Sequence, residues 1–371
     1  MIDITFADSV ENIAPHDWER ACASTNPLWQ RGAFASFERA GFGADGMRYL
    51  IVREDDVVRA IVPFFWFRAY PLDAGGGGWL DRSMASLRTV LPRLLTIGVL
   101  FAGNPIGTGW PDVRYGPAIA AKLRETASQL GLPWLILKDL SPRQAMQLAD
   151  EDSFAFASLP DTRLTLGYAT FDDYLAALPS AARRNARSKL RRFAASGLRL
   201  EVLDDFAALA PRLEVLYANV LRRAKVRLDR VDARFFAEAA HWPETSLVTC
   251  FDGNTLAGFL LVTAHDGEAI ALRVGLDYTR ARDSFAYFAM HYEAIRHAID
   301  RRYAAISFCQ STYGVKRELG CALVPLAYVA THRNAAVRAV LRGALPRLLE
   351  HYMRACGLTT PLAATHVPEG A

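Results

Sequence analysis

The sequence predicts an α+β protein with mixed, mainly antiparallel sheets and helices on both faces, built as two similar halves in tandem. Three observations lead to this prediction. Strand and helix signals alternate along the chain, and their order repeats once. Turn signals such as Asp266-Gly267 join neighbouring strand signals as hairpins. A length of 371 residues also suits two or three domains better than one.

The first half opens with a predicted hairpin. Runs of β-branched and aromatic residues at Tyr49–Arg53 and Val57–Phe67 flank the acidic turn Glu54-Asp55-Asp56. The next predicted elements are a glycine loop at Gly75–Gly78, a strand at Ile97–Ala102, a helix at Val113–Leu130, a strand at Trp134–Asp139 and a helix from Ser141 to Ala149. We expect the linker between the halves at Ser158–Tyr168, where Leu159-Pro160-Asp161 signals a turn.

The second half repeats this plan. Helices are predicted at Phe171–Leu178, Ser180–Ser196, Asp205–Arg223, Asp232–Ala240, Ser284–Ile299, Tyr313–Leu319 and Asn334–Cys356, the last broken by Gly343 and Pro346. Strands are predicted at Leu198–Leu203, Ser246–Phe251, Leu256–Ala264, Ala269–Gly275, Ala305–Cys309 and Leu323–Thr331. The second, third and fourth of these strands form a meander, because tight turns join them.

Composition excludes several classes of protein. The N-terminus lacks a secretory signal, and the longest apolar run, Leu94–Ala102, is about half the ~20 residues that a membrane span needs. Five cysteines without a C-x-x-C pair argue against a disulfide framework or a structural zinc site. Glu293 and His297 stand four apart on one predicted helix, but His291 and His297 do not match H-E-x-x-H, so no metal is expected. We expect a cytoplasmic protein without a membrane span.

Positive charge gathers in one segment. Between Ser180 and Arg230 there are 13 Lys and Arg residues and five Asp and Glu, whereas the whole chain has a net charge of only +4. Such a local field favours an anionic partner. A solvated helix face is the simpler interpretation of the run Arg183–Arg192, which has no interleaved aromatic residues for stacking on bases. We expect no DNA binding, and RNA remains an open alternative.

Short motifs add a family resemblance. Tyr313, Lys316 and Gly320 match a Y-x-f-K-x-x-f-G signature that follows the fifth strand of the second domain in FemAB-like N-acyltransferases. Asn26-Pro27-Leu28 and the basic run Arg183–Gly197 are similar to further segments of that branch. The order of elements also resembles the plan of the acyl-CoA N-acyltransferase (GNAT) superfamily. The resemblance implies two GNAT-like domains, the first (residues 1–160) non-catalytic and the second (residues 161–333) catalytic, followed by a C-terminal helix and tail (residues 334–371).

One departure leaves the acyl donor open. GNAT enzymes hold the coenzyme A pyrophosphate with a Q/R-x-x-G-x-G/A turn, but the matching segment here, Tyr278–Ala286, has no Gly-x-Gly. The helix start survives with Asp283 or Ser284 as its cap, and Arg280 and Arg282 add positive charge for donor phosphates. Acyl-CoA is the expected donor. Aminoacyl-tRNA is the alternative, because FemAB-like members that use it also lack the glycine turn.

The resemblance also implies roles at the site. Tyr313 is the expected general acid, and Lys316 is expected to contact an anionic substrate group or the developing oxyanion. Gln310 and Ser311 end the fifth strand and are candidate hydrogen-bond donors, with strand-end capping as the simpler role. Arg273 interrupts an apolar strand and is a candidate ligand for a carboxylate or phosphate. For the general base, His265 and Asp277 remain candidates, although a surface turn explains both more simply.

Two further expectations concern the function as a whole. A small-molecule amine is the expected acceptor. The other class of protein that stays open is a non-catalytic binding or scaffold module. The loop Gly103–Gly109 is expected to be structural, because no Lys-Ser/Thr follows it and a P-loop is therefore excluded. No Tyr-x-x-Lys pair follows the strand Trp134–Asp139, which favours a structural first half.

Overall fold

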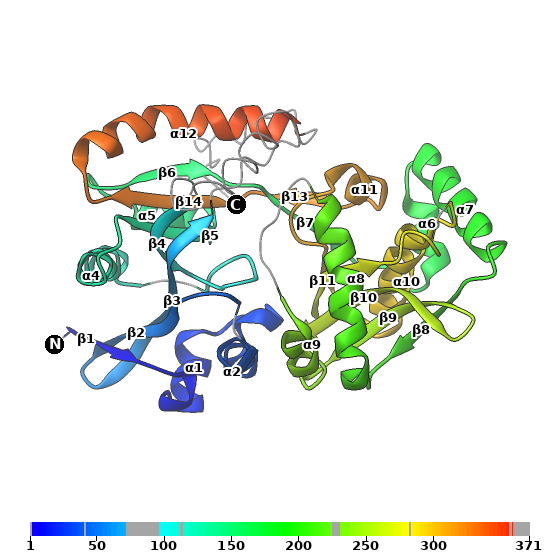
Figure 1. Cartoon of the computed structure of the whole chain (residues 1–371), viewed down its shortest axis with the longest axis horizontal. Helices are drawn as coiled ribbons and strands as arrows, with labels where there is room; N and C mark the ends of the chain where they lie inside the picture. The colour runs from blue at the N-terminus through cyan, green and yellow to red at the C-terminus, as the bar shows by residue number, and fades with distance from the viewer. Residues whose placement is uncertain are drawn as a thin grey trace. The chain divides into compact units, whose positions relative to one another are not determined.

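The computed structural model describes residues 2–40, 42–71, 96–111, 114–224, 231–281, 283–355 and 358. The chain forms two compact units (Figure 1). Unit 1 comprises residues 1–23, 43–160 and 325–371, and unit 2 comprises residues 24–42 and 161–324. The described residues of each unit form one seven-stranded sheet in which antiparallel pairs predominate. The predicted fold class, α+β with mixed, mainly antiparallel sheets, is confirmed.

The sheet of unit 1 has the order β1-β2-β3-β4-β5-β14-β6. Its strands are β1 (Ile2–Ala7), β2 (Gly46–Glu54), β3 (Val57–Pro71), β4 (Thr96–Ala102), β5 (Trp134–Leu140), β6 (Phe154–Ala157) and β14 (Ala327–His332). Its helices are η1 (Val10–Asn12), α1 (Pro15–Ala21), α4 (Gly116–Gln129), α5 (Pro142–Leu148) and α12 (Ala335–Ala355). The strands β4 and β5 are parallel, and apolar side chains of α4 and α5 pack on this sheet to form the core.

The sheet of unit 2 repeats that plan in the order β8-β9-β10-β11-β12-β7-β13. Its strands are β7 (Asp161–Thr165), β8 (Arg199–Leu203), β9 (Thr245–Asp252), β10 (Thr255–His265), β11 (Glu268–Leu276), β12 (Ala305–Ser307) and β13 (Ala322–Val324). Its helices are η2 (Pro27–Trp29), α2 (Arg31–Ala40), α6 (Phe171–Ala177), α7 (Ser180–Ala194), η4 (Ala207–Leu209), α8 (Ala210–Arg223), α9 (Ala233–Ala239), α10 (Ala286–Asp300) and α11 (Tyr313–Glu318). Among the described residues of this unit, the single parallel pair is β11 with β12.

Local signals account for the predicted hairpins. Asp266 and Gly267 join β10 to β11 and both have positive φ, 47° and 79°. Asp55 and Asp56 do the same between β2 and β3, with φ of 49° and 62°. Positive φ at both central residues is the requirement of a type I′ turn, whose twist matches that of paired strands. These turns therefore set the register of the strands around them.

The chain passes between the two units more often than the sequence predicts. The sequence predicts contiguous domains and a single strand at Leu323–Thr331. The structure instead has β13 in unit 2 and β14 in unit 1, separated at Pro325 and Leu326. Proline has no backbone N–H to donate to a ladder, so a strand ends readily there. The expected linker, Ser158–Tyr168, likewise contains β7, which lies between β12 and β13.

The N-terminal helix α2 belongs to unit 2 rather than to the first half of the chain. Arg39 forms an ion pair of 2.7 Å with Glu238. The indole N–H of Trp242 donates to the hydroxyl of Ser36 at 2.9 Å, and the Phe37 ring packs edge-on against the same indole. Burial of these aromatic rings stabilises the contact of α2 with α9, and no local pattern in the sequence specifies that partner.

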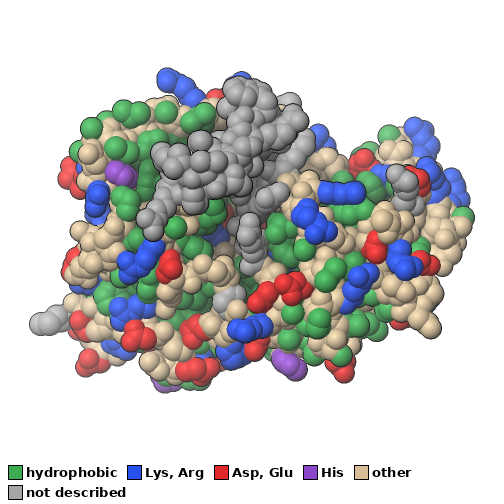
Figure 2. Space-filling model, viewed as in Figure 1, with side chains coloured by type: hydrophobic (Ala, Val, Ile, Leu, Met, Phe, Trp, Pro, Cys, Tyr) green, Lys and Arg blue, Asp and Glu red, His purple; other side chains and the backbone are tan. Residues whose placement is uncertain are grey.

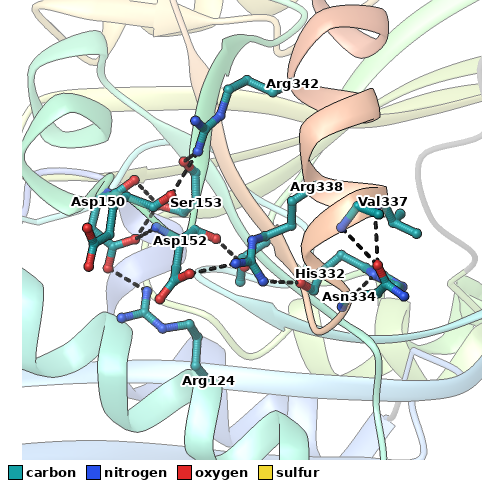
Figure 3. A network of polar contacts seen from close by, with 12 residues as sticks. Arg124, Asp150, Asp152, Ser153, His332, Asn334, Val337, Arg338 and Arg342 are labelled. Carbon is teal, nitrogen blue, oxygen red and sulfur yellow. Dashed lines mark hydrogen bonds and ion pairs between the residues drawn. The ribbon is translucent and has the colours of Figure 1, made fainter.

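The C-terminal helix α12 is anchored in unit 1 by a polar network (Figure 3). Arg338 donates to the carboxylate of Asp152 at 2.6 Å and to the carbonyl of His332 at 2.9 Å, while Arg342 donates to backbone carbonyls of the same turn. The predicted break at Gly343 and Pro346 is wrong, because the helix continues through both. Leucines of α12 pack on Phe154 and Phe156, and this tertiary contact outweighs the hydrogen bond that proline removes.

One buried hydroxyl offers a test of the core of unit 2. The hydroxyl of Tyr292 on α10 is buried and has no hydrogen-bond partner within the described ranges. Burial raises the pKa of this phenol to about 12. We expect Tyr292→Phe to raise the free energy of unfolding by about 1 kcal/mol, because it removes an unsatisfied polar group and keeps the ring. Urea denaturation measures this, and a loss of stability would contradict the described burial.

Candidate functional site

The parallel strands of unit 2 diverge, so that the second half of β11 is not paired with β12. Their pairing covers Glu268–Ile270 with Ala305–Ser307, and β11 continues to Leu276 without β12 beside it. The chain after β12 follows β7 instead, because the N–H of Phe308 donates to the carbonyl of Thr162 at 2.9 Å. The residues that follow β12 lead into α11 and lie close to β11 and α10. Side chains from these three elements therefore come near one another where β11 and β12 separate.

The five residues between β12 and α11, here called the 308–312 segment, have an unusual backbone. Cys309, Ser311 and Thr312 have φ of 58°, 72° and 47°. Side chains other than glycine rarely adopt this region, and strained residues of this kind concentrate at functional sites. The segment therefore needs interactions that hold it in place.

Lys316 supplies two of these interactions. Its ammonium donates to the carbonyl of Cys309 at 2.8 Å and to the carbonyl of Gln310 at 2.7 Å. Thr162 adds a third, since its hydroxyl donates to the same Cys309 carbonyl at 2.7 Å. Only 3% of Lys316 is exposed, and burial lowers the pKa of this side chain to about 8. The ammonium of Lys316 is thus hydrogen-bonded to the backbone of the 308–312 segment.

The other predicted residues of this segment lie beside Lys316 in the chain. Tyr313 is the first residue of α11 and is buried, with 3% exposed, and Gln310 is also buried. Ser311 is partly exposed. Arg273 lies half-buried on the free part of β11, where it donates to the carbonyl of Leu272 at 2.7 Å. The thiol of Cys309 lies 3.8 Å from the carbonyl of Ala271, which places the segment against that part of β11.

The residues predicted for the donor phosphates have other partners in this structure. Arg280 pairs with Asp252 at 2.7 Å and lies 3.8 Å from Asp277. Ser284 donates to the carbonyl of Ala281 at 2.8 Å and accepts from the N–H of Ala286. Ser284 therefore shapes the turn that starts α10. Arg282 lies outside the described residues.

The start of α10 has two further cations beside it that come from α7. The ammonium of Lys189 lies 3.5 Å from the ring centre of Phe288, and the guanidinium of Arg192 lies 4.4 Å from that of Phe285. In the described part of the chain, the backbone N–H groups of Tyr287 and Phe288 have no acceptor. Free N–H groups, a helix dipole and nearby cations together favour an anion. Figure 2 shows Lys and Arg side chains gathered over α7.

His291 is a residue of the site that the sequence analysis did not single out for catalysis. Its Nδ1 lies 2.7 Å from the carbonyl of Tyr287, so Nδ1 carries the proton. The ring stacks on Phe308 at 5.5 Å, and burial together with the charge of Lys316 lowers the pKa of His291 to about 4. The imidazole is therefore neutral at pH 7. A polar residue on the buried face of α10 is the signal that marks this position in the sequence.

The two bases suggested by the sequence do not approach the 308–312 segment through any interaction of the described residues. Asp277 accepts from Thr279 and from the N–H of Arg280, and the Thr279 hydrogen bond lowers the pKa of this carboxyl. A carboxylate stabilised in this way is a weak base. Across the described ranges, no group of three or more His, Cys, Asp and Glu residues is arranged to hold a metal ion. None of the described helices is long and apolar enough to cross a membrane.

Comparison with known proteins finds a family model that matches part of unit 2. The model of the acetyltransferase (GNAT) domain matches residues 180–317, which include α10, β12 and most of α11. A Mycobacterium tuberculosis protein provisionally named 8-amino-7-oxononanoate synthase 2 is 24% identical over 276 residues. The match covers 70% of this chain and 35% of that relative, so the chain spans about a third of the relative's length.

Solved structures share the fold at low sequence identity. FemX has a TM-score of 0.55 at 10% identity, over 92% of this chain and all of that one. A tandem GNAT protein from the clavulanic acid biosynthesis pathway has a TM-score of 0.50 at 13% identity, over 90% and 99%. L-PGS from Bacillus licheniformis has a TM-score of 0.50 at 14% identity, over 85% and 95%. Residues 180–317 therefore match a GNAT acetyltransferase domain model, and the chain as a whole shares the fold of a solved tandem GNAT protein and of FemX.

Proposed function

We propose that this protein is an N-acyltransferase that moves an acyl group from an acyl-CoA-type donor to the amine of a small molecule. The amine attacks the thioester carbonyl and a C–N bond forms. The C–S bond breaks, and the amine releases its proton to water, from which Tyr313 regains the proton that it donates. Tyr313 donates a proton to the leaving thiolate as general acid. The reaction takes place in unit 2, and no covalent intermediate with the protein is needed.

The observation that carries this proposal is the divergence of β11 from β12. It leaves the β11 edge from Ala271 to Leu276 without β12, opposite the 308–312 segment that leads into Tyr313. A free strand edge offers backbone donors and acceptors to the amide groups of an extended donor arm. Arg273, Gln310 and Ser311 lie along the same two segments and are proposed to bind the substrates.

The start of α10 supports a phosphate-bearing donor. Two backbone N–H groups at the start of α10 have no acceptor among the described residues. Arg192 and Lys189 of α7 lie over the neighbouring rings, and Lys189 also pairs with Glu318. These groups replace the missing Gly-x-Gly turn as a source of positive potential. The solved clavulanic acid pathway protein is described as a form without AcCoA, which agrees with a coenzyme A donor for this fold.

Unit 1 is proposed to be non-catalytic. Its loop after β4 occupies the place of the 277–285 loop of unit 2, but its polar groups are used internally. The side chain of Asn104 accepts from the N–H groups of Ile106 and Gly107, and Lys138 donates to the carbonyl of Asn104 at 2.8 Å. A loop whose N–H groups are already bonded has few left for an anion.

Aminoacyl transfer from tRNA is the second candidate. Arg184, Arg187 and Arg191 are exposed on one face of α7 and have no ion-pair partner in the described ranges. A stripe of free arginines suits a nucleic-acid backbone. FemX shares the fold, which keeps this branch open. A non-catalytic scaffold role would predict binding of neither donor.

Thermal unfolding with added donors tests these candidates. We expect acetyl-CoA or a long-chain acyl-CoA at about 100 times its Kd to stabilise the protein by about 2.7 kcal/mol, because it binds only the folded state. If only charged tRNA raises the unfolding temperature, and the increase becomes smaller as the salt concentration rises, the result would support aminoacyl transfer from tRNA. The absence of a shift with every donor would contradict the acyl-CoA proposal.

A matched pair of variants locates the donor site. The double variant Lys189→Gln/Arg192→Gln removes the cations beside α10 and is expected to abolish most of the acyl-CoA shift. Arg199→Gln is the control, because Arg199 also lies over a phenylalanine ring, Phe251, but stands on the edge strand β8. If acyl-CoA stabilised the double variant and the Arg199→Gln control equally, the start of α10 would be excluded as the donor site.

A further inference from the structure

The 308–312 segment has a conformation that its own residues disfavour. Three of its residues have positive φ, and none of them is glycine. The next residue, Tyr313, starts α11 and takes its position from this backbone. A segment of this kind stays in one conformation only when its surroundings determine it.

Two of the surrounding contacts come from Lys316. Successive carbonyls, those of Cys309 and Gln310, both accept from its ammonium at 2.8 and 2.7 Å. Hydrogen bonds from a charged donor are stronger than neutral ones, and water does not compete where the side chain is 97% covered. Lys316 therefore joins the start of the segment to the helix that follows it.

From this geometry we propose that Lys316 is a positioning residue: it holds the 308–312 segment in its strained conformation and thereby places Gln310, Ser311 and Tyr313 for acyl transfer. The expected effect of Lys316 on turnover rests on the proposed function. The expected effect of Lys316 on the conformation of the 308–312 segment does not depend on it. It differs from the role that the family resemblance suggests, in which the lysine contacts the substrate or the oxyanion.

The chain contains a matched control for this proposal. In unit 1, Lys138 has 15% of its side chain exposed and also donates to loop carbonyls, those of Asn104 at 2.8 Å and of Pro105 and Gly107 at 3.4 Å. Lys138 also pairs with the carboxylate of Asp139 at 2.9 Å. Replacing either lysine with methionine removes an ammonium from carbonyl acceptors of a loop, and Lys138→Met additionally removes the pair with Asp139. Lys138 has no part in the proposed site, so the control separates a local effect from a general loss of stability.

The thiol of Cys309 reports on the segment without any substrate. Cys309 is partly buried in the folded protein, with its sulfur against the Ala271 carbonyl. We expect Lys316→Met to speed alkylation of Cys309 by iodoacetamide about tenfold, because the segment opens more often once two charged hydrogen bonds are lost. Peptide mapping assigns the label to Cys309 rather than to another cysteine. Lys138→Met is expected to leave the rate unchanged.

Turnover and chemical rescue complete the test. Lys316→Met is expected to lower kcat much more than it raises KM, and ethylammonium added to Lys316→Ala is expected to slow Cys309 alkylation again. Unchanged alkylation in Lys316→Met with lost turnover would overturn the proposal in favour of direct substrate contact. Equal acceleration in Lys316→Met and Lys138→Met would also overturn it. If no acyltransferase activity is found, the alkylation rates still decide the positioning role.

Discussion

Replacing Tyr313 with phenylalanine is expected to lower kcat by about two orders of magnitude, which is the usual range for loss of a general acid. The substitution keeps the ring, which is buried at the start of α11. Only the proton donor is lost, so KM and thermal stability should change little. Steady-state kinetics with a thioester donor measures this, with release of the free thiol as the signal.

The control for Tyr313→Phe is Tyr292→Phe, which removes a buried hydroxyl from α10 in the same unit. That hydroxyl has no partner among the described residues, so its loss should leave kcat unchanged. If Tyr313→Phe kept more than about half of the wild-type turnover, the general-acid assignment would be wrong. A faster reaction with donors whose leaving group is more acidic would support it, since such donors need less help from an acid.

Replacing Gly275 with alanine is expected to lower the free energy of unfolding by about 3 kcal/mol or more. A Cβ at this position would lie 2.8 Å from the carbonyl carbon and the Cβ of Leu216 on α8, and closer still to the Phe259 ring. Backbone atoms of a packed helix cannot yield as the end of a flexible side chain can. The whole of α8 would have to move away from β11.

Urea denaturation of Gly275→Ala beside Gly167→Ala measures this effect. Gly167 also lies in unit 2, and a Cβ there meets no atom within 4 Å. We expect the control to stay within about 0.5 kcal/mol of the wild type. If Gly275→Ala were as stable as this control, the close approach of α8 to β11 would be incorrect.

The sequence alone determines the local elements and indicates the resemblance to GNAT-like proteins. Turn chemistry at Asp266 and Gly267 and the alternation of strand residues around it predict the meander correctly, because these signals act within a few residues. The spacing of Tyr313, Lys316 and Gly320 likewise reflects one short helix, which begins at Tyr313 and is followed by Gly320 with φ of 83°. These features depend on residues that are neighbours in the chain, so the local sequence pattern is enough to predict them.

The partners of those elements are decided by the tertiary structure. The periodicity of β14 predicts a strand and gives no reason for its place between β5 and β6, and the residues of α2 predict a helix without indicating α9 as its partner. The role of Lys316 has the same origin. Its charge and position in the motif suggest a substrate contact, whereas the carbonyls that it bonds are brought to it by the path of the chain along β7. An apolar face can be buried against any apolar neighbour, and a carbonyl can accept from any donor that is close. Which neighbour is close depends on the fold of the whole chain and not on the local sequence.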